Sequence, residues 1–176
     1  MHSALTVKAD AIANVLVSDI NIHIPNTADR AQINAIWDTG ATSCAITMKV
    51  AYALKLPQTG FAQVNTANGL VTQPTFTVDI GLPNGVLIQS VLVTGVDGLS
   101  SGCEALIGMD IITLGDFSIT NHNGRTCMSF RVPSSHEIDY VENINYGITK
   151  ITNVNDKKPD WLKPSSGSYA RRGKKK

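Results

Sequence analysis

The segment Ala35-Ile36-Trp37-Asp38-Thr39-Gly40-Ala41-Thr42 is the most informative part of this 176-residue chain. An apolar run ends in a carboxylate, Asp38, which is followed at once by a hydroxyl residue and a glycine. We interpret the run as a strand that delivers Asp38 into a tight loop. In such a loop Gly40 permits close approach of the backbone, and its N–H can donate a hydrogen bond to the carboxylate. Because an Asp-Thr-Gly tripeptide also occurs in ordinary turns, its surroundings have to be considered.

Short strands separated by turn signals surround this segment and continue to about Val132. Residues 16–24 alternate apolar and polar side chains, and residues 31–37 are expected to form the returning strand. Glycine-containing turns at 68–69, 83–85 and 121–124 are each expected to connect a hairpin. Only Ile46–Leu56 and Met109–Leu114 have a helical pattern. The sequence therefore predicts an all-β domain that is mostly antiparallel.

Composition divides the chain into four parts. Residues 1–14 form an N-terminal segment, residues 15–132 the domain, and residues 133–155 a C-terminal extension for which both part strand and irregular structure are left open. Residues 156–176 are rich in Lys, Pro, Ser, Gly and Arg and cannot bury enough apolar surface to fold, so we expect a disordered basic tail. Eight basic side chains and one acidic side chain give residues 157–176 a net charge of +7. Residues 1–156 carry −6, so the overall charge of +1 combines an acidic body with a basic tail.

Several classes of protein do not fit this sequence. No apolar run approaches the ~20 residues of a membrane span, and the first residues do not form a signal peptide. Three cysteines without CxxC spacing argue against a disulfide framework or a zinc site and favour a reducing, cytoplasmic location. Scattered histidines and the absence of nucleotide-binding glycine motifs predict no metal and no cofactor. The acidic body argues against a nucleic-acid partner.

Four features, in this order, resemble the retropepsin-like aspartic proteases, and in particular their bacterial single-domain members. They are the strand ending in Asp-Thr-Gly-Ala, the amphipathic segment 46–56, a glycine-bearing hairpin at 64–71 where the family has its flap, and Leu106-Ile107-Gly108 ahead of a short helix. The resemblance covers roughly residues 15–132. It implies a closed barrel with a flap hairpin and one or two short helices. Thr42 stands where viral members commonly have Asp, and Trp37 is bulkier than the usual aliphatic residue, so viral substrate preferences are not carried over.

The resemblance also implies an aspartic endopeptidase, in which two carboxylates share one proton and activate a water. Because Asp-Thr-Gly occurs once and no Asp-Ser-Gly is present, a second chain has to supply the second aspartate in a two-fold homodimer. By resemblance the catalytic loop is Asp38, Thr39 and Gly40. Contacts to a polypeptide substrate are assigned to the floor and flap residues Ala41, Thr42, Ala67, Asn68 and Gly69.

Other residues and functions have simpler interpretations. Asp110 is expected to cap a short helix, Cys44 and Cys103 to be core or loop residues, and Gly108 to form a tight passage near the catalytic loop. One alternative function is a catalytically silent module that keeps the peptide groove. Another is a regulatory protease domain whose tail, residues 156–176, directs it to an anionic partner.

Overall fold

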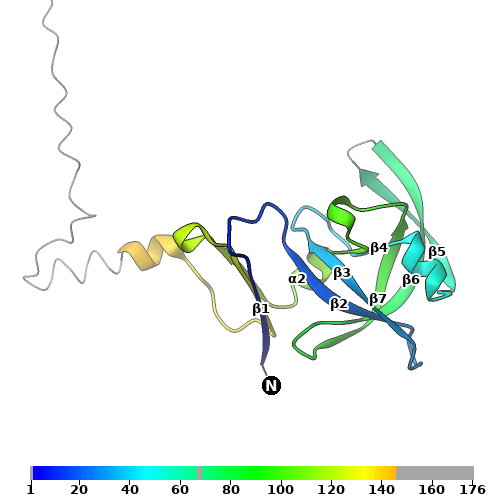
Figure 1. Ribbon diagram of the computed structural model, residues 1–176, viewed down its shortest axis with the longest axis horizontal. Coiled ribbons are helices and arrows are strands. Elements are labelled where there is room, and N and C mark those ends of the chain that lie inside the picture. The colour runs from blue at the N-terminus through cyan, green and yellow to red at the C-terminus, as the bar shows by residue number, and fades with distance from the viewer. Residues whose placement is uncertain (1, 67–68, 146–176) are drawn as a thin grey trace, which may run out of the picture. The chain divides into compact units, whose positions relative to one another are not determined.

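A computed structural model describes residues 2–66 and 69–145 (Figure 1). The chain divides into two compact units, residues 1–136 and 137–176, and each is described by itself. The helices of the first unit are α1 (Met48–Ala53) and α2 (Met109–Ile112), with 3-10 turns at Ser100–Gly102 and His122–Gly124. Its strands are β1 (Ser3–Lys8), β2 (Val17–His23), β3 (Arg30–Trp37), β4 (Ala45–Thr47), β5 (Gln58–Thr66), β6 (Gly69–Gly81), β7 (Leu87–Val96), β8 (Ala105–Ile107), β9 (Asp116–Thr120) and β10 (Cys127–Val132).

The larger sheet closes on itself. Its strands follow the order β2-β3-β8-β4-β7-β6-β5, and β6 also pairs with β2, opposite residues 21–23. Most neighbours are antiparallel, whereas β3–β8 and β4–β7 are parallel. The ring consists of β2, β3, β8, β4, β7 and β6, and each of these strands has a neighbour on both sides over part of its length, whereas β5 pairs only with β6. The predicted all-β, mostly antiparallel closed barrel is therefore confirmed.

A separate three-stranded sheet, β1-β10-β9, completes the first unit. β9 and β10 form the hairpin expected around residues 121–124, with Phe117 opposite Phe130. β1 lies in the segment 1–14, which the sequence analysis separates from the domain, and pairs along its whole length with β10. The indole of Trp37 stacks on Phe117, with ring centroids 5.7 Å apart, and contacts Phe130 at 5.1 Å. The end of β3 is thus packed against the small sheet.

The side chains that face inward follow the alternation expected for half-buried strands. In β2 the buried positions are Ser18, Ile20 and Ile22, which alternate with more exposed residues. Ile80 and Ile107 are likewise almost inaccessible to solvent. Burying an isoleucine side chain of this kind stabilises the fold by roughly 1.5–3 kcal/mol. The core therefore fills the barrel that carries loop 38–44 and continues into the small sheet, where Met128 and Phe130 are buried.

The other sequence predictions differ in detail from the structure. The turn at 83–85 connects β6 to β7, as expected. β5 and β6 pair antiparallel up to Thr66 and Gly69, as expected for a hairpin, and Asn68 of the predicted 68–69 turn lies outside the described residues. The β5–β6 hairpin extends from the barrel (Figure 1). Residues 46–56 are not helical throughout, because Ala45–Thr47 form strand β4 before α1 begins. Helix α2 confirms the second helical segment but ends at Ile112.

Of the second unit, and of the extension 133–155, the structure describes only part. Residues 133–145 hold no strand, and residues 140–145 are helical. The Asp139 carboxylate accepts hydrogen bonds from the backbone N–H groups of Val141, at 2.8 Å, and Glu142, at 3.0 Å. Aspartate therefore caps this helical stretch in the way that N-terminal helix positions favour. Residues 146–155 and the tail 156–176 lie outside the described residues.

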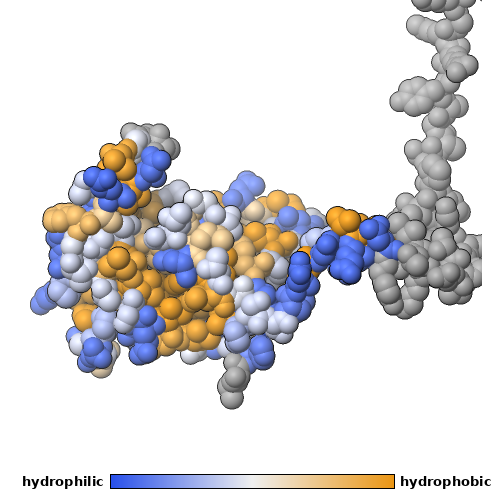
Figure 2. All heavy atoms as spheres, turned by 180° about the vertical axis from the view of Figure 1, so that it is seen from behind, coloured by the Kyte–Doolittle hydropathy of each residue, from blue (hydrophilic) through white to orange (hydrophobic). Residues whose placement is uncertain are grey.

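Apolar side chains also remain on the surface. Figure 2 shows a hydrophobic area surrounded by polar residues on the face seen from behind. Large apolar residues that are exposed in the first unit include Phe61, Leu70, Leu87 and Leu92. In the part of the chain that the structure describes, no helix is long and apolar enough to cross a membrane.

Candidate active site

Asp38 directly follows strand β3. It lies at the carboxyl end of the region in which β3 pairs with β8. The two strands are parallel, with Trp37 opposite Ile107. The backbone N–H of Asp38 then donates to the carbonyl of Ile107 at 3.0 Å. The position of the carboxylate along the chain is therefore fixed by β8.

The carboxylate of Asp38 is held by the loop that follows it. Its Oδ1 accepts a hydrogen bond from the N–H of Gly40 at 2.8 Å, and a Cβ at position 40 would lie 3.1 Å from the same oxygen. The N–H of Ala41 donates to the carbonyl of Asp38 at 3.3 Å. This confirms the expected close approach of Gly40. Asp38 is half-buried, while Thr39 and Gly40 are exposed, so the outer face of the loop is open to solvent.

Helix α2 supports the second half of this loop. The N–H of Met109 donates to the carbonyl of Ala41 at 2.8 Å, and that of Asp110 to the carbonyl of Thr42 at 3.2 Å. A Cβ at Gly108 would lie 2.6 Å from the carbonyl carbon of Ser43. No residue with a side chain fits there without movement of the backbone. The expectation that Gly108 forms a tight passage next to the catalytic loop is confirmed.

The loop ends at Cys44, whose backbone and thiol both contact Asp110. The N–H of Cys44 donates to Asp110 Oδ2 at 2.9 Å, and its thiol donates to Oδ1 at 3.0 Å. The N–H of Gly108 donates to the Cys44 sulfur at 3.4 Å. Burial, foremost, and the neighbouring Asp110 carboxylate raise the pKa of the Cys44 thiol, so it stays protonated and able to donate.

These contacts correct the interpretation of Asp110 and agree with that of the cysteines. Asp110 lies within α2, whose N-cap is Gly108, and the capping role expected for Asp110 was wrong. Its carboxylate instead holds Cys44. Cys44 and Cys103 are both buried, as expected, and burial also raises the pKa of the Cys103 thiol. A buried, protonated thiol is a poor nucleophile.

The flap assignment falls only in part on described residues. Gly69 is the first residue of β6 and has φ +105°, a conformation that L-residues rarely adopt. Next to it in the hairpin, Leu70 is opposite Asn65 and is 64% exposed. Ala67 and Asn68 lie outside the described residues.

The structure thus places Asp38, Thr39, Gly40, Ala41 and Thr42 in one loop and Gly69 in the β5–β6 hairpin. Sequence reasoning missed the contact between Cys44 and Asp110. Their separation of 66 positions leaves no local pattern that could reveal it. Within the described residues, no group of three or more His, Cys, Asp or Glu side chains could hold a metal ion.

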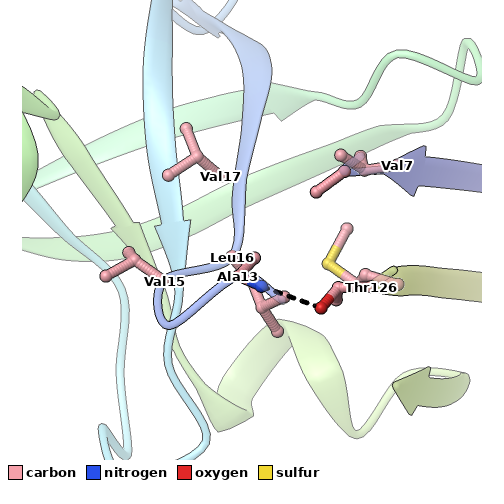
Figure 3. Close-up of a pocket in the computed structure, with 8 residues that line it drawn as sticks. Val7, Ala13, Val15, Leu16, Val17 and Thr126 are labelled. Atoms are coloured by element: carbon pink, nitrogen blue, oxygen red, sulfur yellow. Dashed lines mark hydrogen bonds between the residues drawn. The ribbon is translucent and has the colours of Figure 1, made fainter. Parts of the chain in front are cut away.

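A cavity elsewhere in the first unit does not belong to this site. It has a volume of about 220 Å³ and is lined mainly by apolar residues, among them Val7, Leu16, Val17 and Met128 (Figure 3). On one side Thr126 accepts a hydrogen bond from the N–H of Ala13 at 2.9 Å. None of the lining residues comes from loop 38–44.

The closed barrel and its Asp-Thr-Gly loop are those of a retropepsin-like aspartic protease. The model of one protein family, described as gag-polyprotein putative aspartyl protease, matches residues 24–113, which include all of loop 38–44. The chain belongs to this family.

Solved structures with a similar fold include viral and bacterial proteins. A retropepsin-like aspartic protease from Rickettsia conorii is 18% identical, with a TM-score of 0.46 over 75% of this chain and 96% of that one. The EIAV protease in complex with the inhibitor HBY-793 is 20% identical, with a TM-score of 0.44 over 56% and 86% of the two chains. The simian foamy virus (mac) protease is 16% identical, with a TM-score of 0.36 over 54% and 91%. No curated protein matches the sequence.

Proposed function

We propose that this chain is an aspartic endopeptidase that works as a homodimer, with Asp38 of each subunit forming the catalytic pair. One observation carries the proposal: the Asp38 carboxylate is fixed by the N–H of Gly40 at 2.8 Å in a loop whose outer face is exposed. The sequence offers this loop once per chain. The carboxylate is accessible and oriented, but a catalytic pair needs a second aspartate. An identical chain can supply that aspartate in a two-fold dimer.

The chemistry follows from the proximity of two like charges. Two carboxylates that face each other across one water cannot both be ionised without a large penalty, so they share a proton. The ionised aspartate takes a proton from the water as its oxygen attacks the peptide carbonyl. The protonated aspartate hydrogen-bonds to the carbonyl oxygen and then supplies a proton to the leaving nitrogen. The hydrogen bond from Gly40 keeps one oxygen of each carboxylate oriented for these transfers.

The remaining site residues are assigned supporting roles. Thr39, exposed beside Asp38, is expected to hydrogen-bond to the partner's loop across the dimer axis. Ala41 and Thr42 form the floor, and Ala67, Asn68 and Gly69 the flap, of a groove that binds an extended polypeptide through its backbone. Closure of the flap excludes bulk water and strengthens the hydrogen bonds within the site.

The proposed location is the cytoplasm. The three cysteines of the chain, Cys44, Cys103 and Cys127, are free thiols, and two of them are buried. Free thiols are typical of a reducing compartment.

The test combines the mass of the particle in solution with cleavage of a peptide library. Wild type is expected to be a dimer that cleaves a subset of the peptides. Asp38→Asn is expected to remain a dimer and to lose at least about 100-fold in kcat/KM, since proton transfer by the pair is abolished. Asp29→Asn, at an exposed loop carboxylate, is the control and should cleave normally. A wild-type dimer that binds peptides but cleaves none would instead support the catalytically silent module.

A further inference from the structure

We propose that Asp110 is a positioning residue for Asp38, and that it acts through Cys44 by fixing the far end of loop 38–44 to helix α2. Only the expected effect on kcat rests on the proposed function; the contact between Asp110 and the loop does not. The contacts on which it stands involve residues that do not themselves touch the substrate in the proposed reaction.

The loop is fixed at its start and in its middle by backbone contacts alone. At the start, the Asp38 N–H is bound to the Ile107 carbonyl at 3.0 Å. In the middle, the carbonyls of Ala41 and Thr42 accept from the first N–H groups of α2. At the far end, the carbonyl of Cys44 accepts from the N–H of Thr94 at 3.2 Å and β4 begins at Ala45, which leaves the N–H and the thiol of Cys44 to be held on the α2 side.

The side chain of Asp110 supplies this contact. Its two oxygens accept separately from the N–H and the thiol of Cys44, at 2.9 and 3.0 Å. A further hydrogen bond from the N–H of Ile111, at 3.0 Å, orients the carboxylate plane. Three donors from two segments therefore converge on one side chain. The thiol is a weak donor, but it is inaccessible to solvent, so water does not compete for its bond to the carboxylate.

The thiol acts as a bridge rather than as a reactive group. It donates to Asp110 and accepts from the N–H of Gly108, so it connects the carboxylate to the residue that packs against Ser43. A serine hydroxyl can donate and accept in the same way, whereas an alanine can do neither. Without Asp110, the N–H of Cys44 would be left in the interior without this acceptor.

The consequence for catalysis is one of orientation. Loss of the contact between Cys44 and α2 lets the loop shift relative to the helix and allows Asp38 to leave the geometry needed for the shared water. A displacement of about 1 Å can cost on the order of 100-fold in rate. Binding of an extended peptide depends mainly on backbone contacts with the floor and flap. Loss of Asp110 is therefore expected to lower kcat far more than it raises KM.

The experiment measures kinetics and thiol accessibility in the same variants of the full chain. Wild type, Asp110→Ala, Asp110→Asn, Cys44→Ser and Cys44→Ala are compared, with Asp29→Ala as the control for loss of a carboxylate. Wild type and the aspartate variants are treated with iodoacetamide under native conditions, and labelling of Cys44 and Cys103 is followed separately by mass spectrometry, whereas the two Cys44 variants are compared by kinetics alone. Both thiols are buried, so Cys103 reports general opening of the fold and Cys44 reports opening of the loop.

We expect Asp110→Ala to increase the ratio of Cys44 to Cys103 labelling at least about tenfold and to lower kcat by about 10- to 100-fold, with KM within about threefold. Asp110→Asn keeps one acceptor oxygen, so its labelling ratio and its kcat should lie between those of wild type and Asp110→Ala. If Asp110→Ala does not fold, Asp110→Asn is used for the test. Cys44→Ser should retain more activity than Cys44→Ala. Asp29→Ala should match wild type.

Two results would overturn the proposal. One is equal acceleration of labelling at both cysteines, which would assign Asp110 to general stability. The other is a selective increase at Cys44 with unchanged kcat, which would separate the loop contact from catalysis. If wild type cleaves no peptide, the proposed function fails, and the labelling ratio alone decides whether Asp110 fixes the loop.

Discussion

Gly108 and Ser43 are in backbone contact: a Cβ at position 108 would lie 2.6 Å from the carbonyl carbon of Ser43 and 2.7 Å from its oxygen. Because both neighbours are backbone atoms, Gly108→Ala has to displace loop 38–44 or α2. We expect a loss of roughly 1–3 kcal/mol in the free energy of unfolding. We also expect a fall in peptide cleavage, since the displaced loop carries Asp38. Denaturant unfolding and kcat/KM measure the two effects.

Gly98→Ala is the matched control for this substitution. A Cβ at Gly98 has no atom within 4 Å. Its stability should stay within about 0.5 kcal/mol of wild type. If Gly108→Ala is as stable and as active as Gly98→Ala, the close packing of loop and helix is not important in solution.

The indole N–H of Trp37, the residue directly before Asp38, donates a buried hydrogen bond of 2.9 Å to the hydroxyl of Ser18. Trp37→Phe leaves the hydroxyl without its donor, and Ser18→Ala leaves the indole N–H without its acceptor. Each is expected to lower the free energy of unfolding by about 1–3 kcal/mol. The double variant should lose less than the sum of the two, because both remove the same bond. Additive losses in thermal or denaturant unfolding would contradict a coupled pair.

Gly69, at φ +105°, opens the strand that returns from the proposed flap. Gly69→Ala strains this conformation by about 1–3 kcal/mol, although the surrounding space is free. We expect a drop in kcat/KM of roughly tenfold, because 1.4 kcal/mol corresponds to a factor of ten.

Gly85→Ala provides a control with the same kind of strain at another hairpin. Gly85 has φ +82°, also in open space, and lies in the β6–β7 turn. It should reduce stability without reducing peptide cleavage. Equal effects of the two variants on kcat/KM would remove the reason to assign Gly69 to substrate binding.

Asp116 accepts hydrogen bonds from Ser134 and Arg131 and from the N–H of Ser135. The Ser134 hydroxyl and then the Arg131 guanidinium lower the pKa of this carboxyl well below its ordinary range. Because the folded-state pKa is lower than the unfolded one, these contacts stabilise the fold above the ordinary aspartate pKa of about 4. The stabilisation is lost as the pH falls from there through the folded-state pKa.

Asp116→Asn should therefore be less stable than wild type near neutral pH, and the difference should shrink as the pH falls below about 4. Urea unfolding at a series of pH values measures it. Asp29→Asn, at an exposed carboxylate, should show no comparable trend. A difference for Asp116→Asn that is constant with pH would show that the titration of Asp116 does not contribute.

The elements that could be predicted from sequence are those with local signals. Alternation identified β2, glycine turns identified the hairpins, and the residues around Asp38 indicated that Gly40 would contact its carboxylate. β1 was missed because Ser3–Lys8 is short, has no turn signal, and pairs with residues more than a hundred positions away. The same reason hid Asp110: its partner Cys44 is brought to it by barrel closure. Turns and strands can be predicted from local sequence patterns, whereas contacts between residues far apart in the sequence depend on the complete fold.

The pairing of β1 with β10 also has a consequence for how the chain folds as it is synthesised. Residues 3–8 leave the ribosome early, but the strand on which they pair, Cys127–Val132, is made only after the whole barrel sequence. Until then β1 is an extended apolar–polar segment without its native neighbour. The β1–β10 pairing is a contact of very long sequence separation, and forming such contacts is slow because of loop-closure entropy. Any truncation before residue 127 would leave that first strand permanently unpaired and prone to intermolecular association.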